Sequence, residues 1–581
     1  MIRLHALVFA LLCAICSASD AADPAKVLRL ATSDIDTLDP HQWQDAYSRD
    51  VGSSIFEALY EWNYLARPPS PSPDTAAGQP EVSADGKTWT IRLKPGIYFT
   101  EDPAFRGKRR ELVAEDYVYS IKRYLDPNLR GGGEPLLTDL VVGMRPVVDA
   151  ARMPGAKFDY DARVEGLRAL DRHTLQLRFN DVDYPSATDL LFVRAVAREV
   201  VEAAKGDIQA RPVGTGPYRL KEWQRGTRIV LEAVPGYRTL TFPESADPAH
   251  AALERSMKGK RLPQIGRVEL SVIDEQPVRL LEFDGGKLDY IELRGEAVAR
   301  LLRNGELDPA LAARGIRRIR YSSSSVRSIY INMDDPVVGG MGNDRVALRR
   351  AVALAIDVDS LIRVVYSGQG TPMNQVLVPG VSGHDPDAKK RPFDPVAAQA
   401  LLDRFGYAKR DAQGYRLAPN GAPLALTLTI FTGNVWREIQ TLLHKNMDAI
   451  GLRMEFRVVP VQDLFKENAQ GKFALNIHGR GQTPNGLAFA QFYGPAPPET
   501  NETRFRSADY DTAFRNFLRA TTPAQRLAEA RRMIEIVQTF VPMIPLLVDI
   551  DNAFVQPWVQ GYFPSTYATF YKYMDIASAN K

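Results

Sequence analysis

The chain has 581 residues, of which 45% are hydrophobic and 25% charged, a composition typical of a globular protein of about three domains. The 73 basic and 70 acidic residues leave a net charge of +3, which gives no reason to expect nucleic acid or an anionic membrane as a partner. Both cysteines, Cys13 and Cys16, lie in an N-terminal apolar run. The rest of the chain therefore has no disulfide, thiol nucleophile or thiolate metal site.

The first 21 residues have the pattern of a secretory signal peptide. Arg3 precedes an apolar run over residues 6–16, and small residues then offer cleavage after Ser19 or after Ala21. The run is too short to span a bilayer, and neither cysteine follows the small residue of a lipoprotein signal. We expect removal of residues 1–21 and export of the mature chain to the periplasm; the alternative is a retained anchor or a buried helix.

Strand and helix patterns then alternate along the chain. Alternating apolar residues predict strands at residues 27–31, 89–93, 175–179, 268–272 and 424–430. A Pro-rich stretch at 67–80 predicts a loop, and an apolar stripe at 118–125 predicts a helix. The mixture indicates an α/β fold rather than a bundle or a sandwich.

Capping residues predict four helices in the C-terminal half. Asp394 followed by Pro395 predicts one helix start, and Thr522 followed by Pro523 predicts another. Asp344 is the predicted cap of a helix over 345–356. Asp359 is the predicted cap of the next helix, which we expect to end at Gly368.

No catalytic or metal-binding motif occurs in the sequence. The chain has no GxSxG, HExxH, GxxxxGK[ST] or complete GxGxxG pattern. None of the seven histidines pairs with another at the spacing of a local metal site. We therefore predict no catalytic residues, no cofactor and no metal, and only a metal site assembled from distant residues stays open.

Several segments together resemble a known family. In chain order they are Thr37-Leu38-Asp39-Pro40-His41, Ile55-Phe56-Glu57-Ala58-Leu59, residues 83–99, residues 113–118, Gly214-Thr215-Gly216-Pro217-Tyr218, residues 285–289, residues 345–352, residues 368–372 and residues 557–562. In this order, from about residue 27 to the C-terminus, they are similar to the extracytoplasmic solute-binding proteins of ABC transporters. The resemblance is to the oligopeptide/dipeptide-binding family, which is solute-binding protein family 5.

The resemblance implies a two-lobed periplasmic-binding-protein fold with a hinge and an extra third domain. The implied boundaries are domain I at 27–60, 210–318 and 543–581, domain II at 61–209, and domain III at 319–542. The implied protein is a monomeric receptor rather than an enzyme. It encloses a small molecule, a peptide or peptide-like solute, between the lobes and delivers it to an ABC permease and ATPase complex.

The same resemblance places the ligand site on two segments. They are a segment after the Leu38-Asp39-Pro40-His41 motif and a segment near residue 480, with the candidate ligand-binding residues Gln44, Asp45, Ala46, Tyr47, His478, Arg480, Gln482, Thr483 and Asn485.

One of these positions departs from the family pattern. Peptide-binding relatives have an aspartate at the position of Thr483, and that aspartate receives the peptide's α-amino group. Some dipeptide-binding relatives also have a carboxylate-binding arginine on the strand that matches residues 424–431, and this chain has no arginine there. Either another acid, such as Asp34, Asp36 or Asp45, takes over this role, or the ligand is not a free-amine peptide. It would then be a blocked peptide, a modified amino acid conjugate or another polar metabolite. Arg480 either pairs with a ligand anion or lies at the surface.

The sequence leaves two rival functions open. One is a secreted hydrolase or transferase, and the other is a periplasmic sensor or chaperone that uses the same cleft. Because relatives of this fold also bind nickel complexes, haem, opines and sugars, the fold alone does not fix the ligand. A receptor releases its ligand unchanged, and that property separates it from an enzyme.

Overall fold

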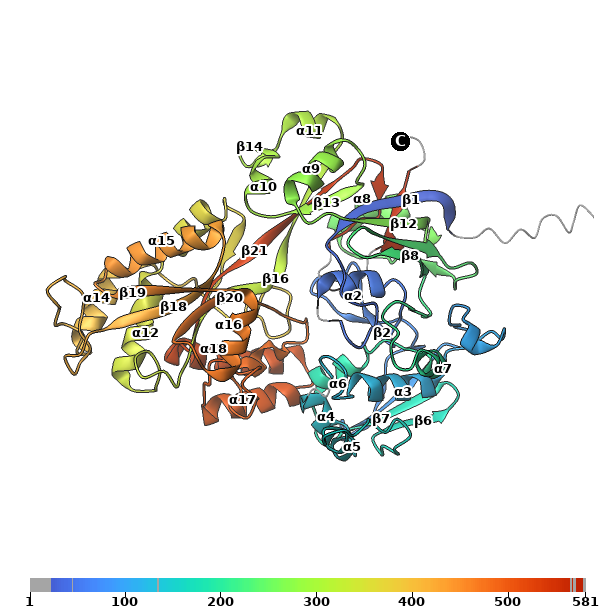
Figure 1. The fold of residues 1–581 in the computed structure, drawn as a ribbon, viewed down its shortest axis with the longest axis horizontal. Coiled ribbons are helices and arrows are strands. Elements are labelled where there is room, and N and C mark those ends of the chain that lie inside the picture. Colours follow the sequence, from blue (N-terminus) through green and yellow to red (C-terminus); the bar gives the residue numbers. More distant parts are fainter. Residues whose placement is uncertain (1–21, 44, 133–134, 565–566, 568–570, 578–581) are drawn as a thin grey trace, which may run out of the picture.

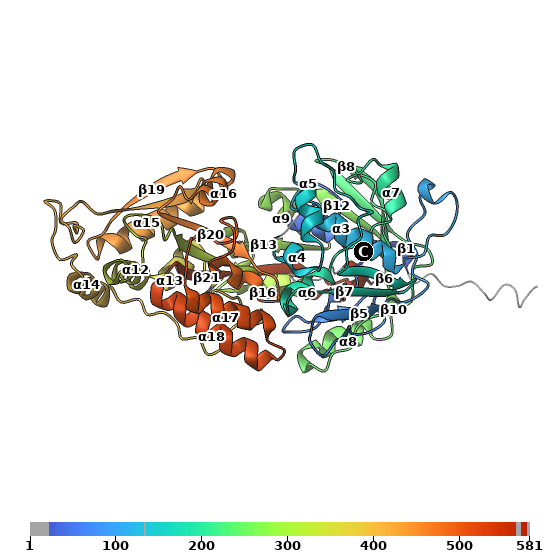
Figure 2. The ribbon, with the colours of Figure 1, turned by 90° about the horizontal axis from the view of Figure 1, so that it is seen from below.

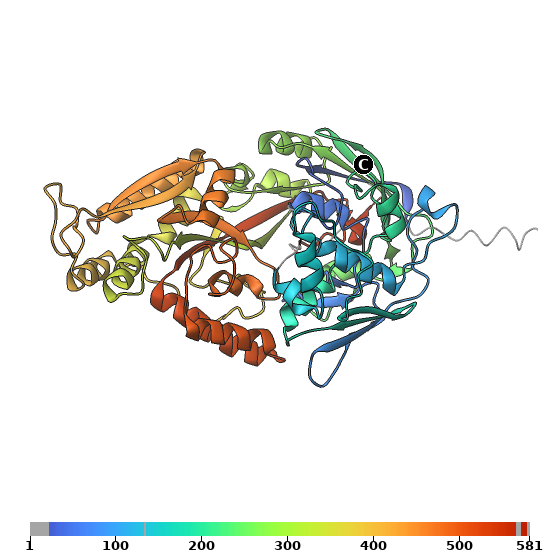
Figure 3. The same cartoon turned by 60° about the horizontal axis from the view of Figure 1, so that its bottom comes forward.

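Two long antiparallel strands connect the two lobes of the chain. The computed structural model describes residues 22–43, 45–132, 135–564, 567 and 571–577, so the predicted signal peptide lies outside the described residues. Strands β16 (Arg317–Ile331) and β21 (Met543–Val555) pair with each other and run from one lobe into the other (Figure 1). Figure 3 shows the same strands between the lobes from another side. The expected two-lobed α/β fold is confirmed.

The first lobe contains two four-stranded sheets. One has the order β1 (Asp23–Thr32), β12 (Ile265–Val272), β9 (Arg228–Ala233) and β8 (Tyr218–Gln224), with β1 parallel to β12 and the other pairs antiparallel. The other is antiparallel, with the order β4 (Glu81–Val82), β5 (Thr88–Arg92), β7 (Thr174–Arg178) and β6 (Leu167–Asp171). Its helices are α2 (Ala46–Gly52), α3 (Ala114–Tyr124), α4 (Pro135–Leu140), α5 (Arg145–Ala151), α6 (Tyr184–Leu190) and α7 (Arg198–Ala203).

Short elements complete the region before β16 and the segment after β21. The Pro-rich stretch predicted as a loop contains strand β3 (Pro71–Pro73), which pairs with β2 (Tyr60–Trp62). The remaining short elements are β10 (Leu240–Thr241), α8 (Ala251–Met257), β11 (Arg261–Leu262), α9 (Gln276–Asp284), β13 (Tyr290–Leu293), α10 (Glu296–Ala299), β14 (Leu302–Arg303), β15 (Glu306–Leu307), α11 (Pro309–Ala313), β22 (Val559–Gln560), β23 (Asp575–Ile576) and 3₁₀ turns at Pro103–Phe105, Pro248–His250 and Tyr571–Tyr573.

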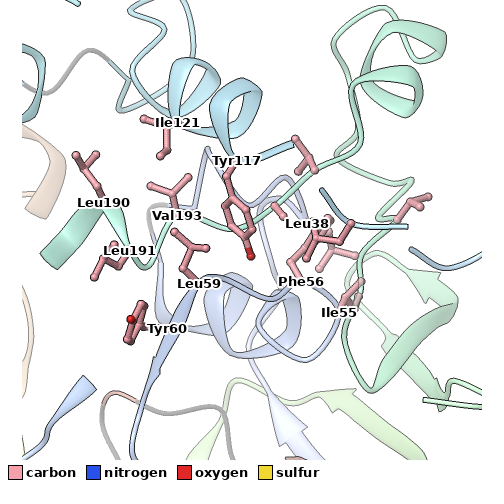
Figure 4. Close-up of a cluster of buried hydrophobic side chains, with 14 of the residues drawn as sticks. Leu38, Ile55, Phe56, Leu59, Tyr60, Tyr117, Ile121, Leu190, Leu191 and Val193 are labelled. Atoms are coloured by element: carbon pink, nitrogen blue, oxygen red, sulfur yellow. The ribbon is translucent and has the colours of Figure 1, made fainter. Parts of the chain in front are cut away.

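One hydrophobic core joins both sheets of the first lobe. Leu38 and Phe56, which lie in two of the motif segments, are fully buried there with Tyr117 of α3 and Leu190 of α6 (Figure 4). Each fully buried side chain of this size contributes about 1.5–3 kcal/mol relative to its exposed state. These motif positions therefore hold distant segments of the lobe together.

The Gly-Thr-Gly-Pro-Tyr motif has a steric explanation. An added Cβ at Gly214 would lie 2.0 Å from the carbonyl oxygen of Ile55, and one at Gly216 would lie 2.6 Å from the same oxygen. The amide of Gly216 donates a hydrogen bond of 2.8 Å to that oxygen. Only glycine permits this close approach between two backbone segments.

The second lobe is built on one mixed sheet. Its order is β13, β21, β16, β20 (Leu475–Gly481), β18 (Ala425–Phe431) and β19 (Arg453–Val459), with β17 (Gly370–Pro372) also paired to β21. Its helices are α12 (Asn343–Ala355), α13 (Val358–Ser360), α14 (Pro395–Arg404), α15 (Asn434–Asp448), α16 (Val461–Gln470), α17 (Ala508–Arg519) and α18 (Pro523–Phe540), with a 3₁₀ segment at Leu487–Phe492. On β16, Ile329 and Ile331 belong to one core and Val326 and Tyr330 to another, so both faces of the sheet are covered.

Two of the four predicted helix caps are correct. Asp394 caps α14 through Ala397 N, and Thr522 forms a capping box with Gln525 at the start of α18. The other two are wrong. Gly342 precedes α12, which places Asp344 inside the first turn, and the side chain that caps α13 is Asp357. The helix predicted to reach Gly368 ends earlier, because α13 passes into a π-helical turn over Leu361–Val365.

The motif histidine, His41, is buried and neutral. Its Nδ1 accepts a hydrogen bond from Arg123 at 3.1 Å, so its Nε2–H donates to the carbonyl of Arg194 at 2.9 Å. Burial, followed by the Arg123 charge, lowers the pKa of His41 to about 4, although the charge of Asp39 opposes the shift. Between this pKa and the unfolded value near 6.5, only the unfolded chain binds the proton.

We therefore expect the proton uptake of His41 on unfolding to lower the free energy of unfolding as the pH falls. Its contribution is complete above about pH 6.5 and is lost towards pH 4, which amounts to about 2 kcal/mol of unfolding free energy between pH 8 and pH 5. Denaturant titrations of the wild type and His41→Gln at both pH values measure this difference, because all other groups are common to both proteins. An unchanged pH dependence in His41→Gln would contradict the account.

Candidate functional site

A cavity of about 960 Å³ lies where the two lobes and β16 meet. The first lobe contributes Trp62, Arg67 and Tyr184 to its wall, and β16 contributes Tyr321, Ser322 and Ser323. The second lobe contributes residues 378–384, Pro484, Asn485 and Arg526. A volume of this size is at the upper end of the range for small-molecule sites. The position between lobes is where a hinge motion would enclose a ligand.

Direct contacts between the lobes lie beside this cavity. The amide nitrogen of Asn485 donates a hydrogen bond of 2.6 Å to Asp189 of α6, and Arg519 of α17 forms an ion pair with Asp181. Helix α17 packs near α6, and Figure 2 shows these helices side by side. Sequence reasoning missed both contacts, because their partners are hundreds of residues apart.

The predicted residues near position 480 have different environments. Asn485 lines the cavity, and its side-chain oxygen accepts a hydrogen bond of 2.7 Å from Thr483. Thr483 is exposed, and through Asn485 it is linked to Asp189 of the other lobe. This part of the predicted site therefore lies at the boundary between the lobes.

The other residues of this segment have structural partners. His478 is buried, stacks on Tyr330 at 4.3 Å and contacts Glu502 at 3.1 Å. Burial alone would raise the pKa of Glu502, but His478 and the charge of Arg480 lower it. Arg480 is half-buried and donates a hydrogen bond of 2.9 Å to the carbonyl of Thr500.

Gln482 closes a loop of the second lobe. It accepts a hydrogen bond from the amide of Val378 and donates one to the carbonyl of Val376. It thereby fixes the loop after β17 that leads into the cavity residues 378–384. Gln482 is buried and does not line the cavity, but its hydrogen bonds hold a segment that does.

The predicted segment in the first lobe begins helix α2. Asp45 caps the helix through hydrogen bonds from the amide and the hydroxyl of Ser48 at 2.7 and 2.6 Å. Ala46 and Tyr47 are exposed, and Tyr47 retains 42% of its accessible surface. Gln44 lies outside the described residues. None of the α2 residues lines the 960 Å³ cavity, so α2 and Asn485 are not part of one described site.

The acids proposed to replace the family aspartate are already engaged. Asp36 pairs with Arg130, Asp45 is the α2 cap, and Asp34 accepts a hydrogen bond from the amide of Ile35. The two segments therefore offer no obvious unengaged carboxylate for a ligand ammonium.

Two acids that sequence reasoning did not single out, on α2 and on β13, interact with each other. Burial raises the pKa of Asp50 to about 7, with Arg49 opposing and Glu292 adding to the shift. Desolvation by the surrounding protein also raises the pKa of Glu292, although its side chain keeps an exposed surface; Glu292 accepts a hydrogen bond of 3.3 Å from Tyr562. No local sequence signal marked them, because one is on helix α2 and the other is on strand β13.

Two further features, a metal-ligand group and a membrane-spanning helix, are not found in the described part of the chain. Within the described ranges, no three His, Cys, Asp or Glu side chains are grouped as metal ligands would be. The helices of that part of the chain include none with the length and apolar character needed for a bilayer crossing.

Comparisons with known proteins agree with the fold. Residues 70–497 match the model of bacterial extracellular solute-binding proteins, family 5 Middle. A curated relative is di/tripeptide-binding protein 2 of Pseudomonas aeruginosa, which is 24% identical over 92% of this chain and 92% of the relative. Another is heme-binding protein A of Haemophilus influenzae, which is 23% identical over 84% of this chain and 82% of the relative.

Solved structures show the same architecture. The structure of the periplasmic binding protein DppA from Helicobacter pylori, in complex with the peptide STSA, has a TM-score of 0.69 and 19% identity over 95% of this chain and 98% of that chain. The structure of HbpA2 from Haemophilus parasuis has a TM-score of 0.71 and 20% identity over 95% and 99%. Because the matching family model covers well over half of its residues, the chain belongs to the bacterial extracellular solute-binding proteins of family 5.

Proposed function

We propose that the protein is the substrate-binding component of an ABC importer. It captures a peptide or peptide-like solute between its lobes and presents it to a permease and ATPase complex. The observation that carries this proposal is the cavity walled by both lobes and by the connecting strand β16 in a member of this family. A ligand that contacts both lobes favours the closed arrangement, which a transporter recognises as the loaded state.

The proposal includes the domain arrangement and export. Domain I comprises 27–60, 210–318 and 543–581, domain II comprises 61–209, and domain III comprises 319–542. The positions of β16 at Arg317–Ile331 and β21 at Met543–Val555 support these boundaries, because both strands begin near a proposed boundary. We propose periplasmic export with a mature N-terminus near Asp20 or Ala22, which N-terminal sequencing of the exported protein tests.

Ligand titration distinguishes a receptor, which binds its solute unchanged, from an enzyme, which converts it. Native mass spectrometry of protein purified from the periplasm should show a retained small molecule, and calorimetry with that molecule should give saturable 1:1 binding. At a free concentration of about 100 times Kd, the ligand should stabilise the protein by roughly 2.7 kcal/mol and raise its Tm. Chemical conversion of the ligand during incubation would overturn the proposal in favour of a hydrolase or transferase.

A further inference from the structure

The ionisable groups on the cavity wall include two arginines and a histidine but no carboxylate among the described lining residues. The wall contains Arg67 from the first lobe, Arg526 from α18 and His384, and none of its described lining residues is an aspartate or glutamate. This absence is unusual for a chain with 70 acidic and 73 basic residues. A ligand ammonium would find no carboxylate on this surface, whereas an anion would find a guanidinium on each lobe.

Neutral acceptors hold Arg67 in place. Its Nη1 donates to the carbonyl of Ala66 at 2.8 Å, its Nη2 donates to the carbonyl of Pro564, and the guanidinium lies over the ring of Phe563 at 4.5 Å. Backbone carbonyls orient the group and leave its charge uncompensated. Arg67 is exposed, so it remains accessible to a ligand anion.

Arg526 has a similar environment on the opposite lobe. It is half-buried, and its Nε donates a hydrogen bond of 3.1 Å to the carbonyl of Ala520. Burial lowers the pKa of this arginine, because the surrounding protein replaces water without supplying a carboxylate. Within the described residues, neither Arg67 nor Arg526 forms an ion pair.

Nearby carboxylates are engaged elsewhere. Asp189 accepts the hydrogen bond from Asn485, and Asp181 pairs with Arg519. Glu292, which accepts a hydrogen bond from Tyr321 of the cavity wall, also accepts one from Tyr562. These contacts leave the two cavity arginines as the main charges that a bound solute would meet.

Aromatic rings and prolines make up much of the rest of the wall. Four aromatic rings face the cavity, and Trp62 among them is supported by stacking on Phe192 at 4.5 Å. The other three rings are those of Tyr184, Tyr321 and Tyr567, and nine described prolines lie on the wall with them. Rigid rings of this kind favour an aromatic or apolar ligand body at low entropic cost.

We propose that this cavity binds an organic anion with an aromatic or apolar body and no free ammonium, such as an N-acylated peptide with a free carboxylate, through the two cavity arginines. The proposal rests on the function proposed above and names its class of solute. It also accounts for Thr483, whose hydroxyl is bonded to Asn485 and supplies no charge for an amine. Pairing of a carboxylate with guanidinium groups on both lobes would favour closure.

Three matched probes test the charge preference. They are N-acetyl-Tyr-Leu with a free carboxylate, its C-terminal amide, and Tyr-Leu with a free amine, each titrated calorimetrically into the mature protein. We expect the acetylated acid to bind at least about tenfold more tightly than either other probe. Replacement of Arg526 or Arg67 by glutamine should weaken binding of the acid about 10- to 100-fold and leave binding of the amide nearly unchanged.

Controls keep the test specific to this site. Arg526→Lys retains the charge and should lose less affinity than Arg526→Gln, while Arg532→Gln on the same helix, outside the cavity wall, should have no effect. Matched circular dichroism spectra and Tm values show that each variant is folded.

The outcomes distinguish this inference from the proposed function. Equal or tighter binding of free-amine Tyr-Leu, with no loss in the arginine variants, would overturn the inference and leave the receptor function intact. If none of the three probes binds, the solute retained on purified protein decides. A solute with a free ammonium group, or one without an anionic group, overturns the inference, and an organic anion without an ammonium group supports it. If no solute is retained either, both the receptor function and the inference fail.

Discussion

Replacing Arg123 with methionine should lower the free energy of unfolding by about 3–5 kcal/mol. The guanidinium of Arg123 donates to both carboxylate oxygens of Asp39 at 2.7 and 2.6 Å, and the two side chains are 1% and 0% exposed. Burial alone would raise the pKa of Asp39, but the Arg123 hydrogen bonds and charge lower it. Removing the arginine would leave a buried carboxylate without its counter-charge.

Chemical denaturation at pH 7 measures this loss, and a second substitution tests its cause. The double variant Arg123→Met with Asp39→Asn should recover a large part of the lost unfolding free energy, because the asparagine amide is uncharged and leaves no buried charge without a partner. A loss below about 1 kcal/mol in Arg123→Met, or no recovery in the double variant, would show that the pair is not the origin of the effect.

Arg238→Met should have an effect of similar size, again about 3–5 kcal/mol. Arg238 donates to both carboxylate oxygens of Glu57 at 2.7 and 2.6 Å and also pairs with Asp74, and both acids are 3% exposed. The surrounding acids raise the pKa of Arg238, although its burial alone would lower it. This one arginine therefore compensates two buried carboxylates from different segments of the first lobe.

An exposed pair provides the matched control for Arg238. Arg228 and Glu222 contact each other at 2.6 Å, but their side chains are 46% and 29% exposed. Arg228→Met should therefore cost no more than about 1 kcal/mol. Equal losses in Arg228→Met and Arg238→Met, measured by the same denaturation curves, would contradict the role assigned to burial.

Local signals in the sequence predicted some helix starts and missed others. Asp394 and Thr522 could be identified as caps because each has a side-chain oxygen that accepts from a free helical amide and each is followed by a proline, which is favoured at the first helical position. The predictions that Asp344 and Asp359 are caps were wrong, because in each case a residue two positions earlier occupies the cap position. Gly342 has the extended backbone that precedes α12, and Asp357 reaches the amide of Ser360.

Predicting the candidate site depended on information that the sequence lacks. The resemblance located the segment containing Asn485, which does line the cavity, but it did not reveal that His478 lies in the interior of its sheet. That outcome depends on β20 lying between β16 and β18. The sequence could not predict that Arg67 and Arg526 line the same cavity, because they are 459 positions apart and only the fold brings them to one wall.

The proposed function requires that the two lobes close on a captured solute. The chain from residue 22 onward has no cysteine, so two introduced cysteines accept fluorophores selectively. Met153 in the first lobe and Val396 in the second are 65% and 76% exposed and are suitable sites. A control pair within the second lobe is Val396 and Val458, the latter 51% exposed.

Single-molecule energy transfer between these sites, with and without the solute that copurifies with the protein, is the most direct measurement. The account predicts a shorter and narrower distance distribution for Met153→Cys with Val396→Cys when solute is bound, and no change for the pair within one lobe. Saturating solute that binds and leaves the distance between the lobes unchanged would contradict capture by closure.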